Sequence, residues 1–375
     1  MSEYESRVKK LQSYLSRKDL SALVLHGDAN ENGTIRWISN FEPLVGSTFV
    51  IVPAEGDPIL VSDSVLHGEP MHSLWWMTWI KDLRESKFGM ENLVATVASV
   101  LREKVIPNSS GGVRIGYVGD YSFPLSLLAA TLPKAQLLNC REDIASIKMP
   151  KSREEISIMR QTTAIASKAM IAGCEAISEG VSESTVVGVI NQVMFEEGAH
   201  DVAFYTMALS GKRTHLKHSP PLGRKMRRGD MVFIDLGSSV FGYYSDLCRT
   251  LTVGKPSDTQ LQILDAALAI HARSSKLLRE GVPTAEVAEN ALLLAREFRL
   301  ERECHVDGHG IGTSMFDPPS IGAHSEGKLE ASTTLAYEPM IFSKRFGTVS
   351  FEDDYLIKRA GGGAELLTNC PRTFF

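Results

Sequence analysis

The segment from Val232 to Asp246 most constrains the fold of the second half of the chain, because it contains two short apolar stretches joined by a loop. Each stretch has the composition of a β-strand, but each contains one aspartate, Asp235 or Asp246. An antiparallel hairpin with its turn centred between Val240 and Phe241 places these aspartates directly opposite each other, with Cβ atoms about 5 Å apart. Two like charges at this distance destabilise each other unless a proton or a cation lies between them. The segment therefore predicts a cation site, although a solvated, exposed side chain is the simpler interpretation of one aspartate alone.

Other residues in this half of the chain could complete such a site. His309 lies in a glycine-rich run, Glu338 precedes a proline, and Glu352 lies in a strand in which apolar and polar residues alternate. A histidine among glycines is more often structural than functional, and the run lacks the GxxxxGK[ST] pattern of a phosphate loop. The charges, however, match, because the two aspartates and two glutamates together need two divalent cations for neutrality. Carboxylates with one imidazole suit Mn²⁺, Fe²⁺, Co²⁺ or Zn²⁺, and two such ions can activate water and polarise a carbonyl group.

These motifs resemble those of the pita-bread metallohydrolases, the family of methionine aminopeptidase, aminopeptidase P, prolidase and creatinase. The family pattern has an Asp-Gly strand, a second Asp followed by Arg-Thr, a His-x-x-Gly-His-Gly-x-Gly loop, a Glu-Pro pair and a Glu-Asp pair. The chain carries these motifs in the same order, as Asp235-Leu236-Gly237, Ser245-Asp246-Leu247-Cys248-Arg249-Thr250, His305-Val306-Asp307-Gly308-His309-Gly310-Ile311-Gly312, Glu338-Pro339 and Glu352-Asp353. The similarity covers nearly all of residues 150–375 and is closest to members of the Xaa-Pro dipeptidase type.

The resemblance implies a site with two divalent metal ions that hydrolyses a C–N bond. The implied metal ligands are Asp235, Asp246, His309, Glu338 and Glu352. A metal-bridging hydroxide would be the nucleophile, and the implied catalytic residues are Glu338, His309 and His218. Glu338 would also act as the general acid/base. His218 matches a family histidine that contacts the substrate and can donate a hydrogen bond to developing negative charge, with a surface histidine as the alternative.

Several positions around the implied site depart from the pattern of the proline-specific peptidases. Those peptidases carry a third histidine where this chain has Phe316, an arginine where it has Ser350, and a glycine where it has Met340. Cys248 replaces the threonine that follows their second aspartate. Loss of one donor to a tetrahedral intermediate typically lowers the rate by about 10²–10³, so a peptidase would need a substitute donor. The predicted substrate-binding residues are His218, His305, Phe316, Met340 and Ser350.

The leading interpretation is a metal-dependent hydrolase, most similar to an Xaa-Pro dipeptidase or aminopeptidase, that acts on a dipeptide or another small molecule. The alternative is a non-peptidase member of the family that cleaves a small amide, a ring amide of the ectoine type or a sulfonium compound such as dimethylsulfoniopropionate. Creatinase works without the metal ligands, so the intact ligand set argues against its chemistry. A metal-free binding module of the same fold is a third possibility, but such a module has no need of four facing carboxylates.

The two halves of the chain predict two domains. Helices and strands alternate in residues 1–147, which resemble the smaller α/β domain that precedes the catalytic domain in creatinase and prolidase. A boundary is expected near Pro150, because Ser152 and Glu155 form the capping-box pattern of a helix start. Residues 148–375 are then expected to form an α+β catalytic domain with the pita-bread fold.

Composition narrows the cellular setting. A formal net charge of −5 gives no reason to expect a nucleic-acid partner, and no apolar run approaches the roughly 20 residues that span a membrane. No apolar signal-peptide segment follows the polar N-terminus. The five cysteines have no CxxC spacing, which favours reduced thiols in the cytoplasm.

The resemblance also predicts a homodimer in which the N-terminal domain lines the pocket of the neighbouring subunit. The aromatic cluster Trp75, Trp76 and Trp79 could contact a substrate across that interface, including a cationic one. Buried packing on a helix or on the dimer face is the alternative interpretation of this cluster.

Overall fold

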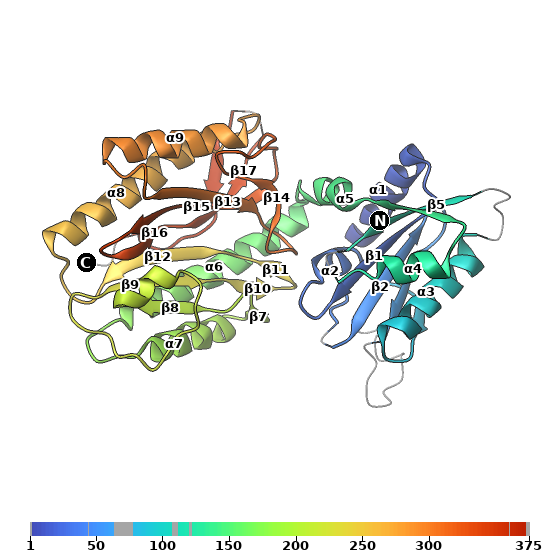
Figure 1. The fold of residues 1–375 in the computed structure, drawn as a ribbon, viewed down its shortest axis with the longest axis horizontal. Helices are drawn as coiled ribbons and strands as arrows, with labels where there is room; N and C mark the ends of the chain where they lie inside the picture. The colour runs from blue at the N-terminus through green and yellow to red at the C-terminus, as the bar shows by residue number, and fades with distance from the viewer. Residues whose placement is uncertain are drawn as a thin grey trace. The chain divides into compact units, whose positions relative to one another are not determined.

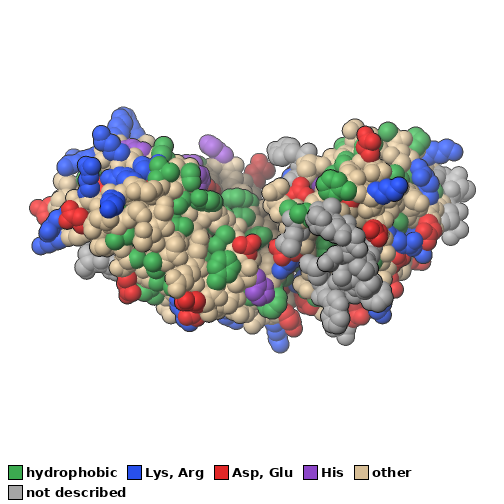
Figure 2. Space-filling model, turned by 90° about the horizontal axis from the view of Figure 1, so that it is seen from below, with side chains coloured by type: hydrophobic (Ala, Val, Ile, Leu, Met, Phe, Trp, Pro, Cys, Tyr) green, Lys and Arg blue, Asp and Glu red, His purple; other side chains and the backbone are tan. Residues whose placement is uncertain are grey.

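The structure is a computed structural model that describes residues 2–43, 45–63, 78–106, 112–119, 122–359 and 361–372 (Figure 1). The chain divides into two compact units, unit 1 from Met1 to Lys148 and unit 2 from Met149 to Phe375. Among the helices of the described ranges, none combines the length and apolar character that a membrane crossing requires. Acidic and basic side chains lie interspersed on the face of both units that Figure 2 shows.

Unit 1 is a mixed six-stranded sheet with helices on both faces, in the strand order β4-β3-β2-β1-β5-β6. Its strands are β1 (Ala22–Asp28), β2 (Ser47–Pro53), β3 (Ile59–Ser62), β4 (Asp82–Glu85), β5 (Val113–Val118) and β6 (Ala135–Asn139). Its helices are α1 (Glu3–Lys18), α2 (Gly33–Ser39), α3 (Met90–Lys104), α4 (Leu125–Thr131) and α5 (Arg141–Lys148). Alternation along β1 sends Leu23 and Leu25 into a core with α1 and α2, whereas Ala22 and Val24 pack with α3.

Unit 2 contains two antiparallel sheets, β12-β9-β8 and β14-β13-β15-β17-β18, and a small sheet β11-β10-β7. The strands are β7 (Asp201–Val202), β8 (Met207–Ser210), β9 (Met231–Leu236), β10 (Ser238–Val240), β11 (Tyr243–Tyr244), β12 (Leu247–Thr252), β13 (Cys304–Gly310), β14 (Asp317–Ser320), β15 (Thr334–Ser343), β16 (Gly347–Ser350), β17 (Asp353–Ile357) and β18 (Ala364–Leu366). The helices are α6 (Arg153–Glu175), α7 (Glu183–Glu196), α8 (Asp258–Ser274) and α9 (Thr284–Glu297), with short 3₁₀ turns η2 (Gly211–Leu216) and η3 (Ser275–Leu277).

The helices of unit 2 cover the outer faces of its two larger sheets. Helices α6 and α7 pack on β9 and β12 through one apolar core, and α8 and α9 pack on β13 and β15 through another. The predicted capping box is present, since the Ser152 side chain accepts a hydrogen bond from the Glu155 backbone N–H and the Glu155 side chain accepts one from Ser152 N–H. The inner faces of the two sheets are left to form the functional site.

The hairpin that carries the two aspartates does not have the predicted pairing. Asp235 pairs with Cys248, not with Asp246, because the turn is centred between Phe241 and Gly242. Both turn residues have positive φ, 49° and 73°, as in a type I′ turn, and glycine at the second position makes that conformation accessible. Asp246 lies just before β12, two residues from Cys248, so the alternation of side chains still directs it to the face that carries Asp235.

Candidate metal centre

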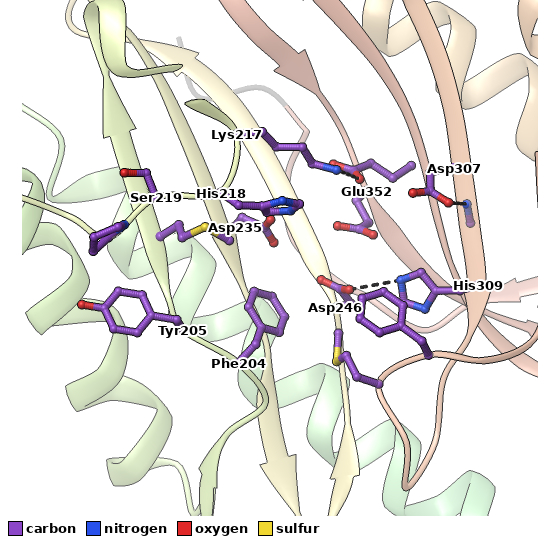
Figure 3. A pocket seen from close by; sticks show the side chains of 16 residues that line it. Phe204, Tyr205, Lys217, His218, Ser219, Asp235, Asp246, Asp307, His309 and Glu352 are labelled. Carbon is purple, nitrogen blue, oxygen red and sulfur yellow. Dashed lines mark hydrogen bonds and ion pairs between the residues drawn. The ribbon is translucent and has the colours of Figure 1, made fainter. Parts of the chain in front are cut away.

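A pocket of about 640 Å³ lies in unit 2, between the inner faces of its two larger sheets (Figure 3). Asp235 on β9 and Asp246 before β12 enter it from one sheet, and His309 on β13, Glu338 on β15 and Glu352 before β17 enter it from the other. The remaining lining residues are Phe204, Tyr205, Met207, Lys217, His218, Ser219, Pro220, Asp307, Gly308, Met315 and Phe316. The pocket thus combines a cluster of carboxylates with a wall of aromatic and thioether side chains.

Two groups of donor atoms in this pocket are close enough to hold a metal ion. Asp246, His309 and Glu352 form one group, and Cys248, Glu338 and Glu352 form the other, with the donor atoms of each group within 4.8 Å of one another. His309 Nε2 lies 3.5 Å from Asp246 Oδ2. Because Glu352 belongs to both groups, the arrangement suits two neighbouring cations that share one carboxylate.

Electrostatics at the site favour bound cations. Burial raises the pKa values of Asp235 and Glu352 well above their ordinary range, and the nearby Asp246 raises them further. Asp235 is only 6% exposed, and within the described part of the chain its Oδ1 has no hydrogen-bond partner. A buried carboxylate oxygen without a partner is costly. Divalent cations would neutralise the repulsion between the carboxylates and would give Asp235 Oδ1 a partner. The residues present therefore fit a metal centre.

Lys217 is a member of the site that the sequence interpretation missed. Its Nζ lies 2.9 Å from Glu338 Oε2, and its side chain is 17% exposed. Burial lowers the pKa of Lys217, but the Glu338 carboxylate outweighs this effect and the pKa is raised overall. The same ion pair partly opposes the burial that raises the pKa of Glu338. The sequence contains one signal for Lys217, its position next to His218, which the resemblance implies as a substrate contact.

His218, which the resemblance implies as a substrate contact, lines the pocket together with Lys217. Burial lowers its pKa, and the adjacent Lys217 ammonium lowers it further. The imidazole is therefore neutral at neutral pH and can donate one ring N–H.

A buried arginine, Arg249 on β12, links the two larger sheets of unit 2 by hydrogen bonds next to the donor residues. The Arg249 side chain is 1% exposed, and its Nη1 donates to the carbonyl oxygens of Cys248, at 2.8 Å, and Glu352, at 2.7 Å. Its Nη2 donates to Asp353 Oδ1 at 2.7 Å. Arg249 therefore fixes the backbone of two donor residues, which accounts structurally for the Arg of the Ser-Asp-x-x-Arg-Thr motif.

Three of the five predicted substrate-binding residues lie outside the pocket lining. Met340 and Ser350 are buried partners on β15 and β16, and Ser350 Oγ donates to the Pro339 carbonyl oxygen. His305, on β13, pairs with Met340 on β15; it is exposed and lies nearer the start of β13 than His309 does. Met340 and Ser350 were expected to contact substrate because they stand where the proline-specific pattern has a glycine and an arginine, but both side chains are buried.

Phe316 does line the pocket, and its side chain is 75% exposed. Its ring lies over His309, with ring centroids 4.5 Å apart. An apolar ring thus stands where the proline-specific pattern has an imidazole donor.

The tryptophan cluster is only partly visible. Trp75 and Trp76 lie outside the described residues. Trp79 stacks on Tyr4, with ring centroids 5.9 Å apart, and its Nε1 donates to the Ile38 carbonyl oxygen, so that it packs within unit 1.

Comparisons with known proteins agree with this geometry. The model of metallopeptidase family M24 matches residues 157–359, and that of the creatinase/prolidase N-terminal domain matches residues 7–149. The Xaa-Pro dipeptidase of Pyrococcus horikoshii is 26% identical over 370 residues, which cover 98% of this chain and 97% of that protein. The Xaa-Pro dipeptidase of Pyrococcus furiosus is 33% identical over 230 residues, 61% of this chain and 66% of that protein.

Solved structures share the fold over nearly the whole chain. The X-Pro aminopeptidase from Thermotoga maritima superposes with a TM-score of 0.85 at 22% identity and covers 98% of this chain and 99% of its own. The prolidase from Pyrococcus horikoshii superposes with a TM-score of 0.83 at 25% identity, with coverage of 98% and 99%.

Proposed function

Because the chain belongs to metallopeptidase family M24 and is a metal-dependent hydrolase with the pita-bread fold, we propose that it is a binuclear enzyme that cleaves Xaa-Pro bonds in small peptides. The observation that supports this proposal most directly is the pair of donor groups that share Glu352 in one pocket. The similarity to two Xaa-Pro dipeptidases supports the choice of bond.

The residues that would hold two divalent ions are Asp235, Asp246, His309, Glu338 and Glu352. When bound, ions such as Mn²⁺, Fe²⁺, Co²⁺ or Zn²⁺ would supply the hydroxide nucleophile and polarise the scissile carbonyl. The proposed role of Glu338 is to accept the water proton and return it to the leaving nitrogen, a role favoured by burial, which raises the pKa of its carboxyl above the ordinary value.

In this proposal, one imidazole N–H and one ammonium group face the reacting carbonyl. His218 donates its ring N–H to the oxygen on which negative charge develops. Lys217 adds an ammonium group in the same pocket and compensates for the donor that is missing at Phe316. The apolar wall, which includes Phe204, Met315 and Phe316, would bind the side chain or the ring of the substrate.

A second candidate function rests on the exposed ring of Phe316 and on Ser350, which replaces an arginine of the proline-specific pattern. Both changes remove polar groups that such peptidases use, while the metal donors remain. A non-peptidase hydrolase of a small amide, a ring amide or a sulfonium compound is therefore the alternative.

Kinetics on matched substrates test the proposal. The full-length protein, loaded in turn with Mn²⁺, Co²⁺ and Zn²⁺, would be assayed on Xaa-Pro dipeptides, on the corresponding Xaa-Ala dipeptides and on small zwitterionic amides. We expect turnover of the Xaa-Pro peptides alone, with loss of activity in Glu338→Gln. Turnover of a small amide with none of any dipeptide would refute the peptidase assignment and favour the alternative.

We also propose that the enzyme is a cytoplasmic homodimer, as the resemblance implies. Light scattering of the purified chain would show twice the monomer mass, and a monomer at micromolar concentration would contradict the proposal.

A further inference from the structure

Cys248 is the one donor of the two groups that the resemblance did not assign to a metal. It pairs directly with Asp235 across the β9–β12 ladder, so both side chains point to the same face. Its side chain is completely buried, and its Sγ lies 3.3 Å from Glu338 Oε1. The sulfur also lies within 4.8 Å of donor oxygens of both Glu338 and Glu352. These contacts place a soft donor among the hard carboxylate donors.

A second observation points to a ligand at the same place. Asp235 faces the pocket (Figure 3), is 6% exposed, and has an Oδ1 atom without a hydrogen-bond partner among the described residues. Asp235 and Cys248 are opposite each other in register, so an ion that satisfied the orphaned oxygen would lie close to the sulfur.

We propose that Cys248 is a sulfur ligand of one of the two cation positions, in a donor set completed by Asp235, Glu338 and Glu352. A thiolate among carboxylates shifts preference away from Mn²⁺ and toward Zn²⁺, Co²⁺ and Fe²⁺. The proposal rests on the proposed function only in requiring that divalent ions bind in the pocket. The thiol proton passes to solvent as the metal–sulfur bond forms, because a coordinating thiol is deprotonated.

Before a hydroxide binds, the charges of the proposed donor set balance when the sulfur is included, with Asp307 of the pocket lining outside this count. Four carboxylates and one thiolate carry five negative charges, and two divalent ions with the Lys217 ammonium carry five positive charges. Cys248 and Lys217 contact opposite oxygens of the same carboxylate, Oε1 and Oε2 of Glu338. The extra anion and the extra cation therefore offset each other within one cluster.

Optical spectroscopy of the cobalt form tests the sulfur ligand directly. The full chain would be freed of metal and titrated with Co²⁺, and we expect a sulfur-to-cobalt charge-transfer band in the near ultraviolet. The band should be absent in Cys248→Thr, which restores the residue of the family pattern and keeps a donor near Glu338. Cys304→Ser is the matched control, because Cys304 lies on β13 of the same unit but belongs to neither donor group, and it should keep the band.

Metal preference provides a second measurement. The ratio of Zn²⁺ to Mn²⁺ affinity, measured by competition with a chromophoric chelator, should shift at least tenfold toward Mn²⁺ in Cys248→Thr. If that variant does not fold, X-ray absorption of the zinc-loaded wild type still decides, because a sulfur ligand scatters at about 2.3 Å. A wild-type protein without the band and without a sulfur scatterer would overturn the inference. If that same protein still cleaved Xaa-Pro peptides, the proposed function would stand without the sulfur ligand. A charge-transfer band in a protein without Xaa-Pro turnover would instead support the sulfur ligand and contradict the proposed function.

Discussion

The substitution Asp353→Asn should destabilise unit 2 by a magnitude that the ion pairs of Asp353 set. The carboxylate is 1% exposed and accepts hydrogen bonds at 2.7 Å from Arg249, Arg372 and Thr368. Burial alone would raise the pKa of Asp353, but Arg249 and other cationic neighbours outweigh it and lower the pKa from 3.8 to about 2. The difference, 3.8 − 2 = 1.8, at about 1.36 kcal/mol per pKa unit gives about 2.4 kcal/mol. Because the substitution leaves the buried Arg249 guanidinium without its carboxylate partner, the upper bound of the loss is about 3–5 kcal/mol.

The pH dependence has a definite sign. The folded-state pKa of Asp353 is depressed, so its contribution is fully present above the unfolded pKa near 3.8 and is lost as the pH falls toward 2. Wild-type protein should therefore lose about 2.4 kcal/mol of stability over this window relative to Asp353→Asn. At pH 7 the variant should unfold at a urea concentration about 1 M lower, if the m-value is about 2–3 kcal/mol/M.

The chain supplies its own controls for this assay. All four tryptophans lie in unit 1, so tryptophan fluorescence follows that unit, whereas far-UV circular dichroism follows both units. Only the circular dichroism transition of unit 2 should move. Asp354→Asn is the matched variant: burial raises the pKa of Asp354 well above its ordinary value, and an asparagine oxygen can still accept the Asp246 backbone N–H. It should be neutral or stabilising; equal losses in the two variants, or the reverse order, would refute the reasoning.

Three further outcomes are expected at the site. Phe316→His should raise kcat on Xaa-Pro peptides at least tenfold, and steady-state kinetics that show a decrease would contradict a missing donor. Lys217→Met should lower kcat by about 10²–10³, whereas the exposed Lys212→Met should not change it. After chelation of the metal, the protein should be more stable at pH 5 than at pH 8, because the pKa values of Asp235 and Glu352 are raised in the folded state and their contribution to stability is lost as the pH rises. Differential scanning fluorimetry measures this difference, and added metal should abolish it.

Strong local patterns in the sequence predicted much of the fold. After the Gly111-Gly112 turn, the sequence predicts a strand from Val113 to Val118, and β5 has these bounds. The sequence also predicts a helix over about residues 90–103, and α3 is one residue longer. It predicts a further helix from about Thr259 to Arg279, but α8 ends at Ser274 and continues as a 3₁₀ turn. Helix ends are set by local capping and packing, which apolar spacing alone does not report.

Contacts that depend on tertiary packing were not accessible from the sequence. Lys217 directly follows η2, and its side chain reaches Glu338 on β15, a contact that no local pattern reveals. Met340 and Ser350 were expected at the substrate because they stand where the proline-specific pattern has a glycine and an arginine. In the structure they are buried partners on β15 and β16, outside the pocket lining.

The β9–β12 hairpin has a different register from the predicted one, yet the prediction placed both aspartates on the correct face of the sheet. The expected pairing joined Asp235 to Asp246, whereas the observed pairing joins Asp235 to Cys248, a shift of two residues along one strand. Side chains alternate with a period of two, so this shift preserves the face on which each residue lies, whereas a shift of one would have reversed it. The signal for the correct turn was Gly242, since a type I′ turn favours glycine at its second central position.

The acidic run Glu352-Asp353-Asp354 shows the limit of charge arithmetic based on sequence alone. The three adjacent carboxylates have the same formal charge, but each has different contacts in the structure. Glu352 faces the metal donors, Asp353 turns away to two arginines, and Asp354 accepts the backbone N–H of Asp246. The pKa of Asp353 is accordingly lowered, while burial raises those of its two neighbours. Counting only the four carboxylates proposed as metal donors, and adding the Cys248 sulfur and the Lys217 ammonium, gives a charge balance that agrees with the sulfur-ligand proposal.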